Sequence, residues 1–228
     1  MIRIYYGETP NVYKVTVAVE EMGLASERVK VDIFKGEQFE PAFLAISPNN
    51  RIPAIVDMEP ADGGEPISVA ESGSILIYLA EKTGRFLPSD PRKRALVLQW
   101  LMWQMSAQGP TLGQYGHFRN YAPEKLAYAI DRFGKESHRL YGLLDEHLTD
   151  REFIAGDYSI ADMISWPWIL FHQHHGIDPD KFPNLNRWYM AIKQRPAVQV
   201  AMRDSVIPDP RTSFAEEERE LLFNQRIK

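Results

Sequence analysis

Hydrophobic and polar positions alternate in short runs over the first 87 residues of the chain. Four of these runs have the two-residue period or the β-branched content of strands, and they cover residues 2–6, 28–34, 53–57 and 67–70. Between them, apolar residues recur at helical spacing, and they predict helices over 12–22, 41–46 and 72–82. The order βαβαββα predicts a small α/β sandwich with a mixed four-stranded sheet.

The pattern changes after residue 87. Residues 88–91 contain two prolines and read as a linker that leads into a helix. Beyond them no strand is predicted, and apolar positions at helical spacing predict helices over 92–108, 123–148, 160–175, 185–194 and 196–203. Gly109-Pro110 is expected to break the first of these helices.

The chain is therefore expected to divide into an α/β domain and an all-helical domain. The expected bounds are 1–87 for the first domain, 88–91 for the linker, 92–205 for the all-α domain and 206–228 for a C-terminal tail. The tail is charged, but Leu221, Leu222 and Phe223 offer apolar side chains that would dock it. A length of 228 residues fits two compact units.

Composition and charge indicate a globular protein without an obvious polyanionic or lipid partner. Hydrophobic residues make up 44% and charged residues 25%, and the formal net charge is −5. No basic surplus points to nucleic acid or to an anionic membrane, and no apolar run is long enough to span a bilayer. The first residues lack the apolar core of a signal peptide, so a cytoplasmic location is expected.

The chain has no cysteine. Disulfide bonds, thiolate metal sites and a cysteine nucleophile of the protein's own are therefore excluded. Any thiol chemistry at this protein must use a thiol that a ligand brings.

Two motifs resemble the glutathione-binding half of the glutathione transferase superfamily. They are Ser47-Pro48-Asn49-Asn50-Arg51-Ile52-Pro53-Ala54-Ile55-Val56 and Glu71-Ser72-Gly73-Ser74-Ile75-Leu76-Ile77-Tyr78-Leu79. Ser159-Ile160-Ala161-Asp162 resembles the capping box of the superfamily's helical domain, and the resemblance extends to about residue 205. It implies a thioredoxin-like N-terminal domain, an all-α C-terminal domain and a homodimer that uses glutathione as co-substrate.

Within the superfamily, further segments resemble the bacterial nu class, a group also similar to the yeast nitrogen-regulatory prion protein. They are Thr9–Asn11, Lys35–Phe39, Ala61–Pro66 and Gly109–Gln114. The nu class is associated with reduction of disulfides and peroxides by glutathione more than with conjugation.

The second motif has residue types that suit the γ-glutamyl end of glutathione. The hydroxyl of Ser72 and the free backbone N–H groups of a helix start can hold a carboxylate, and Glu71 can pair with the ammonium group. The alternative is that these two residues are only a charge and an N-cap. The resemblance also implies a cis peptide bond at Ile52-Pro53, which turns the backbone of Ile52 toward the cysteinyl unit.

Thiol activation is expected from the loop after the first strand. Thr9 and Asn11 stand just before a helix, where a hydroxyl, a carboxamide N–H and backbone N–H groups can stabilise a thiolate. The alternative is that Thr9 and Asn11 are only a loop-and-cap pair without a role in catalysis. Tyr5 and Tyr6 are rival donors, although strand periodicity favours structural roles for both.

Three more residues are candidates for binding glutathione. Gln38 is placed to reach the glycyl end, and Lys35 adds charge near it unless it is only a solvated lysine. In the nu class the arginine that matches Arg132 reaches a glutathione bound across the dimer; the alternative is an ion pair with Glu136 one helical turn away.

The aromatic and histidine clusters of the helical part are expected to have mainly structural roles. The aromatic residues of the first helical hairpin are expected mainly in the core, although this segment walls the second-substrate pocket in the family; they are Trp100, Trp103, Tyr115, Phe118 and Tyr121. His172, His174 and His175 lack neighbouring carboxylates, so no metal is expected.

The leading hypothesis is a glutathione-dependent oxidoreductase that reduces disulfides, and organic peroxides as well. Its site would hold two glutathione molecules or one glutathione disulfide. One alternative is a transferase that conjugates glutathione to carbon electrophiles. The other is a non-catalytic glutathione-binding regulator.

Overall fold

The structure is a computed structural model that describes residues 1–210 and 214–223. Its N-terminal part contains a four-stranded mixed sheet in the order β2-β1-β3-β4. The strands are β1 (Ile2–Tyr6), β2 (Ser26–Lys30), β3 (Ala54–Asp57) and β4 (Ile67–Ala70). Strand β1 pairs in parallel with β2 and antiparallel with β3, because a helix connects the first pair.

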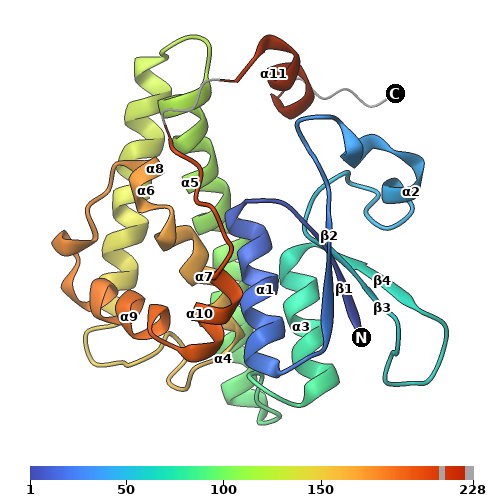
Figure 1. Ribbon diagram of the computed structural model, residues 1–228. Coiled ribbons are helices and arrows are strands. Elements are labelled where there is room, and N and C mark those ends of the chain that lie inside the picture. The colour runs from blue at the N-terminus through green and yellow to red at the C-terminus, as the bar shows by residue number, and fades with distance from the viewer. Residues whose placement is uncertain (211–213, 224–228) are drawn as a thin grey trace.

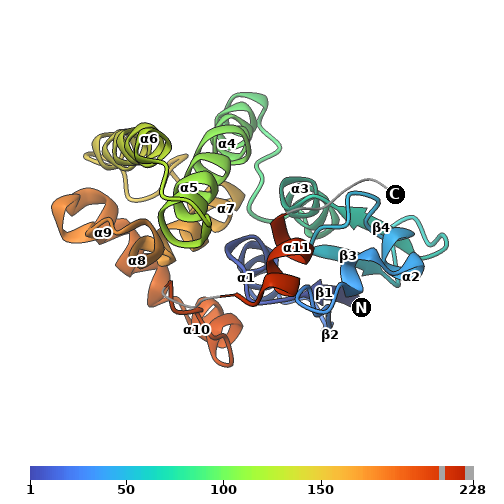
Figure 2. The same cartoon turned by 90° about the horizontal axis from the view of Figure 1, so that it is seen from above.

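Helices cover the two faces of this sheet. The helices α1 (Pro10–Met22) and α3 (Ser72–Thr83) lie on one face, and the short helix α2 (Pro41–Leu44) lies on the other side of the sheet (Figures 1 and 2). Ile2 and Ile4 point from β1 into the core under α1 and α3, whereas Tyr5 packs its ring on Phe43 of α2. Because successive side chains of β1 point to opposite faces of the sheet, the strand contributes to two separate hydrophobic cores. The expected thioredoxin-like βαβαββα order is confirmed.

Strand β2 differs in its bounds from the expected 28–34. It begins at Ser26, opposite Ile2, and ends at Lys30, opposite Tyr6. The backbone N–H of Val31 still donates to the carbonyl of Tyr6 (2.9 Å), but β1 ends there and offers no further partner. The chain then turns, and the N–H of Asp32 donates to the carboxylate of Glu37 (2.6 Å). The pairing strand therefore decides where β2 stops.

As expected, the described residues of the second part of the chain form helices and no strand. Its helices are α4 (Pro91–Trp103), α5 (Gly109–Gly116), α6 (Ala127–His147), α7 (Ile160–Leu170), α8 (His172–His175), α9 (Pro183–Lys193), α10 (Pro196–Met202) and α11 (Glu216–Phe223). Short turns complete it, at η2 (Gln104–Gln108), η3 (His117–Tyr121) and η4 (Pro179–Lys181), and η1 (Glu37–Phe39) lies in the N-terminal part. Ser159 caps α7 in a capping box with Asp162.

The expected break at Gly109-Pro110 is wrong. Gly109 has helical dihedrals (φ −59°, ψ −56°), and α4 continues through the π-helical turn η2 into α5. In that turn the N–H of Gly109 donates to the carbonyl of Gln104, which is five residues earlier. The wider turn accommodates Pro110, which has no N–H to donate, without ending the helix. The expected helix over 160–175, by contrast, divides at Phe171 into α7 and α8.

The two parts share an extensive boundary. Helix α1 packs on α7 and α10, and a two-pronged ion pair joins Arg195 to Glu21 with N–O distances of 2.5 and 2.9 Å. Helix α11 lies across the gap between α5 and the loop that follows β2 (Figures 1 and 2). Of the expected tail 206–228, residues 211–213 and 224–228 lie outside the described residues. No described helix is long and apolar enough to cross a membrane.

Candidate functional site

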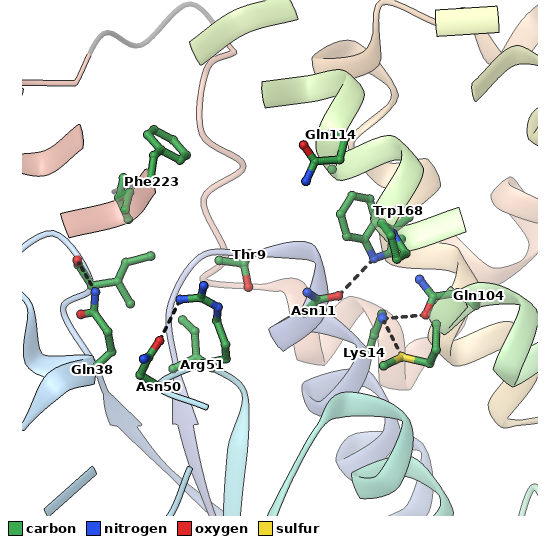
Figure 3. Close-up of a pocket in the computed structure, with 17 residues that line it drawn as sticks. Thr9, Asn11, Lys14, Gln38, Asn50, Arg51, Gln104, Gln114, Trp168 and Phe223 are labelled. Atoms are coloured by element: carbon green, nitrogen blue, oxygen red, sulfur yellow. Dashed lines mark hydrogen bonds between the residues drawn. The ribbon is translucent and has the colours of Figure 1, made fainter. Parts of the chain in front are cut away.

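A cavity of about 620 Å³ opens where the N-terminus of α1 faces the helical part (Figure 3). Its walls come from both parts of the chain: the start of α1, the loop before β3, η1, the segment from η2 to α5, α7 and α11. The lining residues that carry polar side chains are Thr9, Asn11, Lys14, Gln38, Asn50, Arg51, Gln104 and Gln114. Trp168, Leu222 and Phe223 supply apolar walls.

Thr9 lines the cavity at the first turn of α1. It is the N-cap residue, and its hydroxyl oxygen accepts from the N–H of Val12 (3.3 Å). Thr9 is therefore an N-cap, as the alternative interpretation had it, but this role does not prevent its hydroxyl from donating to a thiolate. A hydroxyl that accepts through its oxygen keeps its own proton for another acceptor.

Asn11 also lines the cavity, and a tryptophan fixes its side chain. The indole N–H of Trp168 lies 3.2 Å from Oδ1 of Asn11. Because an indole nitrogen can only donate, the oxygen of the amide must face Trp168. The amide nitrogen, with two N–H donors, is then left on the side of Thr9 (Figure 3). The two residues thus place O–H and N–H donors at the positive end of α1.

The loop before β3 forms the opposite wall. The peptide bond between Ile52 and Pro53 is cis, as the sequence resemblance implied, and Ile52 lines the cavity ahead of β3. Pro53 is buried behind it. Gln38 is 2% exposed and donates to the carbonyl of Ile33 (3.2 Å), while its Oε1 has no partner within the described residues. A buried oxygen with this orientation is a ready acceptor for a ligand.

Glu71 and Ser72 stand at the start of α3, and neither of them lines this cavity. Glu71 is exposed and has φ +64°, a conformation that costs about 1–3 kcal/mol in a non-glycine residue and is typical of functional sites. Glu71 occupies the N-cap position without making a capping bond, and Ser72 is the first helical residue. The cap alternative for Ser72 is therefore wrong. Its hydroxyl instead contacts the ammonium group of Lys14 at 3.2 Å.

Lys14 is a site residue that sequence reasoning missed. Its side chain is 1% exposed, and its Nζ lies 2.7 Å from Oε1 of Gln104 and 3.7 Å from Sδ of Met105 (Figure 3). Burial lowers the pKa of Lys14 to about 7, and the charge of Glu71 opposes this shift. The available signal was a lone lysine within the apolar run of α1, three residues after Asn11 and hence on the same face.

Other expected candidates lie away from this cavity. Arg132 is exposed on α6 and does not line the cavity of its own chain. Tyr5 and Tyr6 are half-buried in the sheet and do not line it either, in agreement with the structural roles that periodicity favoured. Lys35 is 77% exposed at its side chain and pairs with Asp32 (3.3 Å).

A second and more apolar cavity of about 770 Å³ adjoins the first one. The two share Thr9, Ile33, Gly113, Trp168, Leu222 and Phe223. Further walls come from aromatic side chains, namely Phe34, Tyr121, Phe171 and Phe214. Of the aromatic residues expected mainly in the core, Trp100 and Tyr115 are buried, while Tyr121 lines this second cavity. The bordering position of Thr9 places its hydroxyl where ligands in the two cavities would meet.

The three histidines of α8 pack against neighbouring aromatic side chains and do not form a cluster of metal ligands. His174 and His175 are buried, and burial lowers the pKa of both. Within residues 1–210 and 214–223, no three His, Asp or Glu side chains are grouped so that they could hold a metal ion.

Comparisons with known proteins agree with this geometry. Residues 9–82 match the family model "Glutathione S-transferase, N-terminal domain", and residues 104–196 match "Glutathione S-transferase, C-terminal domain". The chain is 48% identical over 213 residues to the disulfide-bond oxidoreductase YfcG of Escherichia coli, covering 93% of this chain and 99% of that protein.

Two solved structures have the same fold as this chain. One is a glutathione transferase from Pseudomonas putida with one glutathione disulfide bound per subunit (TM-score 0.84, 41% identity, 89% of this chain and 91% of that one). The other is a glutathione transferase from Burkholderia graminis with two glutathione molecules bound per subunit (TM-score 0.83, 39% identity, 89% and 88% covered).

Proposed function

The chain belongs to the glutathione S-transferase family, and we propose that it is a glutathione-dependent enzyme that reduces disulfides. The observation that carries the proposal is the pair of donors, Thr9 and Asn11, at the start of α1 in a chain without cysteine. Every sulfur in the reaction then belongs to a ligand. Two glutathione molecules, or one glutathione disulfide, occupy the site, as in the two relatives whose structures contain them.

The chemistry follows from thiolate stabilisation. A free thiol has a pKa of about 8.5, so donors that favour the thiolate raise the fraction of reactive sulfur at neutral pH. The hydroxyl of Thr9 and the side-chain and backbone N–H groups of Asn11 supply these donors. The next two backbone N–H groups of α1 already donate to Thr9. The first glutathione thiolate attacks one sulfur of the substrate disulfide, which forms a mixed disulfide and releases the first substrate thiolate.

A second glutathione completes the reaction. Its thiolate attacks the glutathione sulfur of the mixed disulfide, forms glutathione disulfide and releases the second substrate thiol. Two glutathione thiols are thereby oxidised and one substrate disulfide is reduced to two thiols. An organic peroxide would accept the same two electrons. The protein contributes binding, alignment and charge stabilisation.

We propose the following contacts with glutathione. The start of α3, with Ser72 and Glu71, takes the γ-glutamyl carboxylate and ammonium groups. The backbone of Ile52 pairs with the cysteinyl unit, beside buried Pro53. Gln38, whose Oε1 has no partner in the described part of the chain, faces the glycyl end.

The apolar second cavity favours conjugation as a second candidate function. Its aromatic walls suit an apolar electrophile as well as an apolar disulfide. The two functions separate in an assay that compares a small disulfide, with glutathione disulfide formation followed through glutathione reductase and NADPH, against a chloronitroarene. We expect turnover on the disulfide to exceed conjugation by at least an order of magnitude. Glutathione binding with neither activity would identify a regulator and reject both enzymatic functions.

We further propose that the protein is a homodimer of the nu class. Exposed apolar side chains on β4, α4 and α6 support an interface there; they are Ile67, Leu96, Met102 and Tyr128, the last 82% exposed. Arg132 lies on α6 near this surface and is free to reach the partner's glutathione. Light scattering should give twice the mass of one chain, and a single-chain mass at micromolar concentration would contradict the proposal.

The remaining assignments are proposals of the same kind. The division at 1–87, 88–91, 92–205 and 206–228 is supported by the change from a sheet to helices near Pro91. A cytoplasmic location is supported by the dependence on reduced glutathione, which that compartment maintains. Neither nucleic acid nor a membrane is proposed as a partner. Cell fractionation tests the location.

A further inference from the structure

Lys14 is buried, and in the described part of the chain only neutral groups accept hydrogen bonds from its ammonium group, so the loss of hydration is poorly compensated. Its side chain is 1% exposed in the middle of α1, between α3 and the π-helical turn η2. Within the described residues it forms no ion pair, and Glu71 acts on it only as a more distant charge. An unpaired buried charge is costly, so a position like this one is seldom occupied by lysine for packing alone.

The partners of the ammonium group point to a ligand. Its two oxygen acceptors are Oε1 of Gln104 (2.7 Å) and Oγ of Ser72 (3.2 Å), and its third neighbour is the weakly accepting sulfur of Met105 (3.7 Å). Because Lys14 donates to Oγ of Ser72, the proton of that hydroxyl must point away from Lys14. Its acceptor in this arrangement is again Sδ of Met105, at 3.5 Å.

This orientation suits an anion at the start of α3. A carboxylate is a far better acceptor than a thioether, and the first N–H groups of α3 converge on the same place. The other charged groups near Lys14 are Glu71 on α3 and Arg51 across the cavity; the residues that face it from η2, Gln104 and Met105, are neutral. The site thus contains one carboxylate, the guanidinium of Arg51 and a buried ammonium group that lacks a direct counterion.

We propose that Lys14 is a positioning residue for the γ-glutamyl carboxylate of glutathione, acting through the hydroxyl of Ser72 and through its own positive charge. The inference rests on the proposed function of the same site. It adds a consequence for protons: the bound carboxylate stabilises the charged form of Lys14, so binding at alkaline pH draws a proton onto the protein. Because the pKa of Lys14 is about 7, this uptake occurs above pH 7, where the free protein has released the proton.

The test uses S-methylglutathione, which retains the γ-glutamyl group and has no thiol to titrate. Calorimetry at pH 8 in buffers of different ionisation enthalpy counts the protons taken up on binding. We expect the wild type to take up a substantial fraction of one proton at pH 8 and much less at pH 6. Lys14→Met, close in length and shape, should lose this uptake and bind about tenfold more weakly at pH 6–7.

Controls separate positioning from a merely structural role. Lys93→Met, at an exposed lysine on α4, should leave both affinity and proton uptake unchanged. In disulfide reduction, Lys14→Met should raise KM for glutathione and leave kcat nearly constant, because its contacts are at the γ-glutamyl end. Ser72→Ala should weaken binding but retain most of the proton uptake, because the charge of Lys14 remains.

Each outcome decides the inference. A wild type that reduces disulfides and binds S-methylglutathione with equal proton exchange at pH 6 and pH 8 overturns the role of Lys14 and leaves the proposed function intact. This measurement needs no variant, so it holds even if Lys14→Met fails to fold. Unchanged affinity in a folded Lys14→Met variant overturns it as well. A wild type that does not bind S-methylglutathione refutes the proposed glutathione site and this inference with it.

Discussion

Single side chains at the first turn of α1 determine what the cavity can do chemically. Thr9 accepts a capping bond through its oxygen, and Asn11 accepts from Trp168 through its own oxygen. Both residues therefore have their acceptor atoms occupied and their donor hydrogens available. A site built in this way favours a negatively charged atom such as a thiolate sulfur.

The first prediction concerns Asn11. Asn11→Ala should lower kcat for a small disulfide by about 10–100-fold. Loss of one preorganised donor to an oxyanion costs about 100–1,000-fold, and the effect here should be smaller because sulfur is a softer acceptor than oxygen. KM for glutathione should change little, since most binding contacts lie elsewhere. Thr9→Ala should act in the same direction, and the double variant should be less than additive if both donors serve one sulfur. Steady-state kinetics at two pH values measures this, and unchanged kcat in both single variants would direct attention to Tyr5 and Tyr6.

The second prediction concerns Trp168, which acts through Asn11. Trp168→Phe keeps an aromatic wall but removes the N–H that orients the amide of Asn11. The amide can then rotate, so we expect kcat to fall by about 3–10-fold, less than in Asn11→Ala, in line with a neutral hydrogen bond of about 1 kcal/mol. In the Asn11→Ala background the same substitution should have no further effect on kcat. Full additivity of the two losses would show that Trp168 acts independently of Asn11.

The third prediction is a pH dependence of stability that originates from Lys14. The folded pKa of about 7 lies below the ordinary value of 10.5. Between these values the unfolded chain holds a proton that the folded chain has released, so the free energy of unfolding should rise with pH. The limiting slope for one proton is about 1.4 kcal/mol per pH unit. Urea unfolding at pH 7, 8 and 9 measures it.

The matched variants identify the group responsible. Lys14→Met should remove this rise, whereas Lys93→Met, at an exposed lysine, should follow the wild type. If the wild type and Lys14→Met give parallel curves between pH 7 and pH 9, Lys14 is not the group that titrates.

At the scale of elements, α11 connects the two parts of the chain above both cavities. Arg219 donates to the carbonyl of Tyr121 in the helical part (2.7 Å), while the ring of Phe214 lies 5.7 Å from that of Phe34 after β2. Phe223 packs on His117 at 4.7 Å between ring centroids and lines both cavities. The docking of the tail through Leu222 and Phe223, expected from the sequence, is thus confirmed.

The fourth prediction is that Phe223→Ala weakens binding of apolar disulfides. Loss of one aromatic wall should raise KM for an aromatic disulfide about 3–10-fold, since burial of an aromatic side chain by a ligand is worth about 1 kcal/mol or more. KM for glutathione should change less. The melting temperature should change little, because Phe223 is 38% exposed and contributes little to the core. Met190→Ala, at an equally exposed apolar residue on α9, is the control, and equal effects of the two variants would contradict this role of α11.

At the scale of the whole molecule, the site exists only because the two parts are held together. Thr9 and Asn11 come from one part, and Gly113 and Trp168 come from the other. The boundary between them contains the ion pair of Glu21 and Arg195, whose guanidinium also lies over the ring of Tyr158 at 3.8 Å. The side chain of Glu21 is only 6% exposed.

The fifth prediction follows from that burial. Arg195→Met leaves the carboxylate of Glu21 buried without its partner, and it should lower the free energy of unfolding by roughly 2–3 kcal/mol, below the full range for completely buried pairs because Arg195 is partly exposed. The double variant Glu21→Gln, Arg195→Met should recover most of this loss. Urea unfolding monitored by tryptophan fluorescence measures both. A double variant as unstable as the sum of the single variants would show that the two residues act separately.

The sequence by itself determined the order of elements, the change from sheet to helices and three of the cavity's polar residues, Thr9, Asn11 and Gln38. Such features depend on local patterns: a two-residue period in β1, helical spacing in α1 and α3, and the capping box of Ser159 and Asp162. Thr9, Asn11, Gln38 and Ile52 line the cavity because motifs fix their local backbone. Their catalytic and binding roles, like that of Arg132, stay predictions.

Tertiary structure alone decided what local patterns cannot encode. Strand β2 ends where its partner β1 ends, and the helix continues through Gly109-Pro110 because a wider turn accommodates the proline. Lys14 belongs to the site only because α3 and η2 pack around it, and Trp168 reaches Asn11 from 157 residues away in the chain. Contacts between residues so distant in sequence depend on how the two parts pack, because neither periodicity nor a single motif records which side chains will face one another.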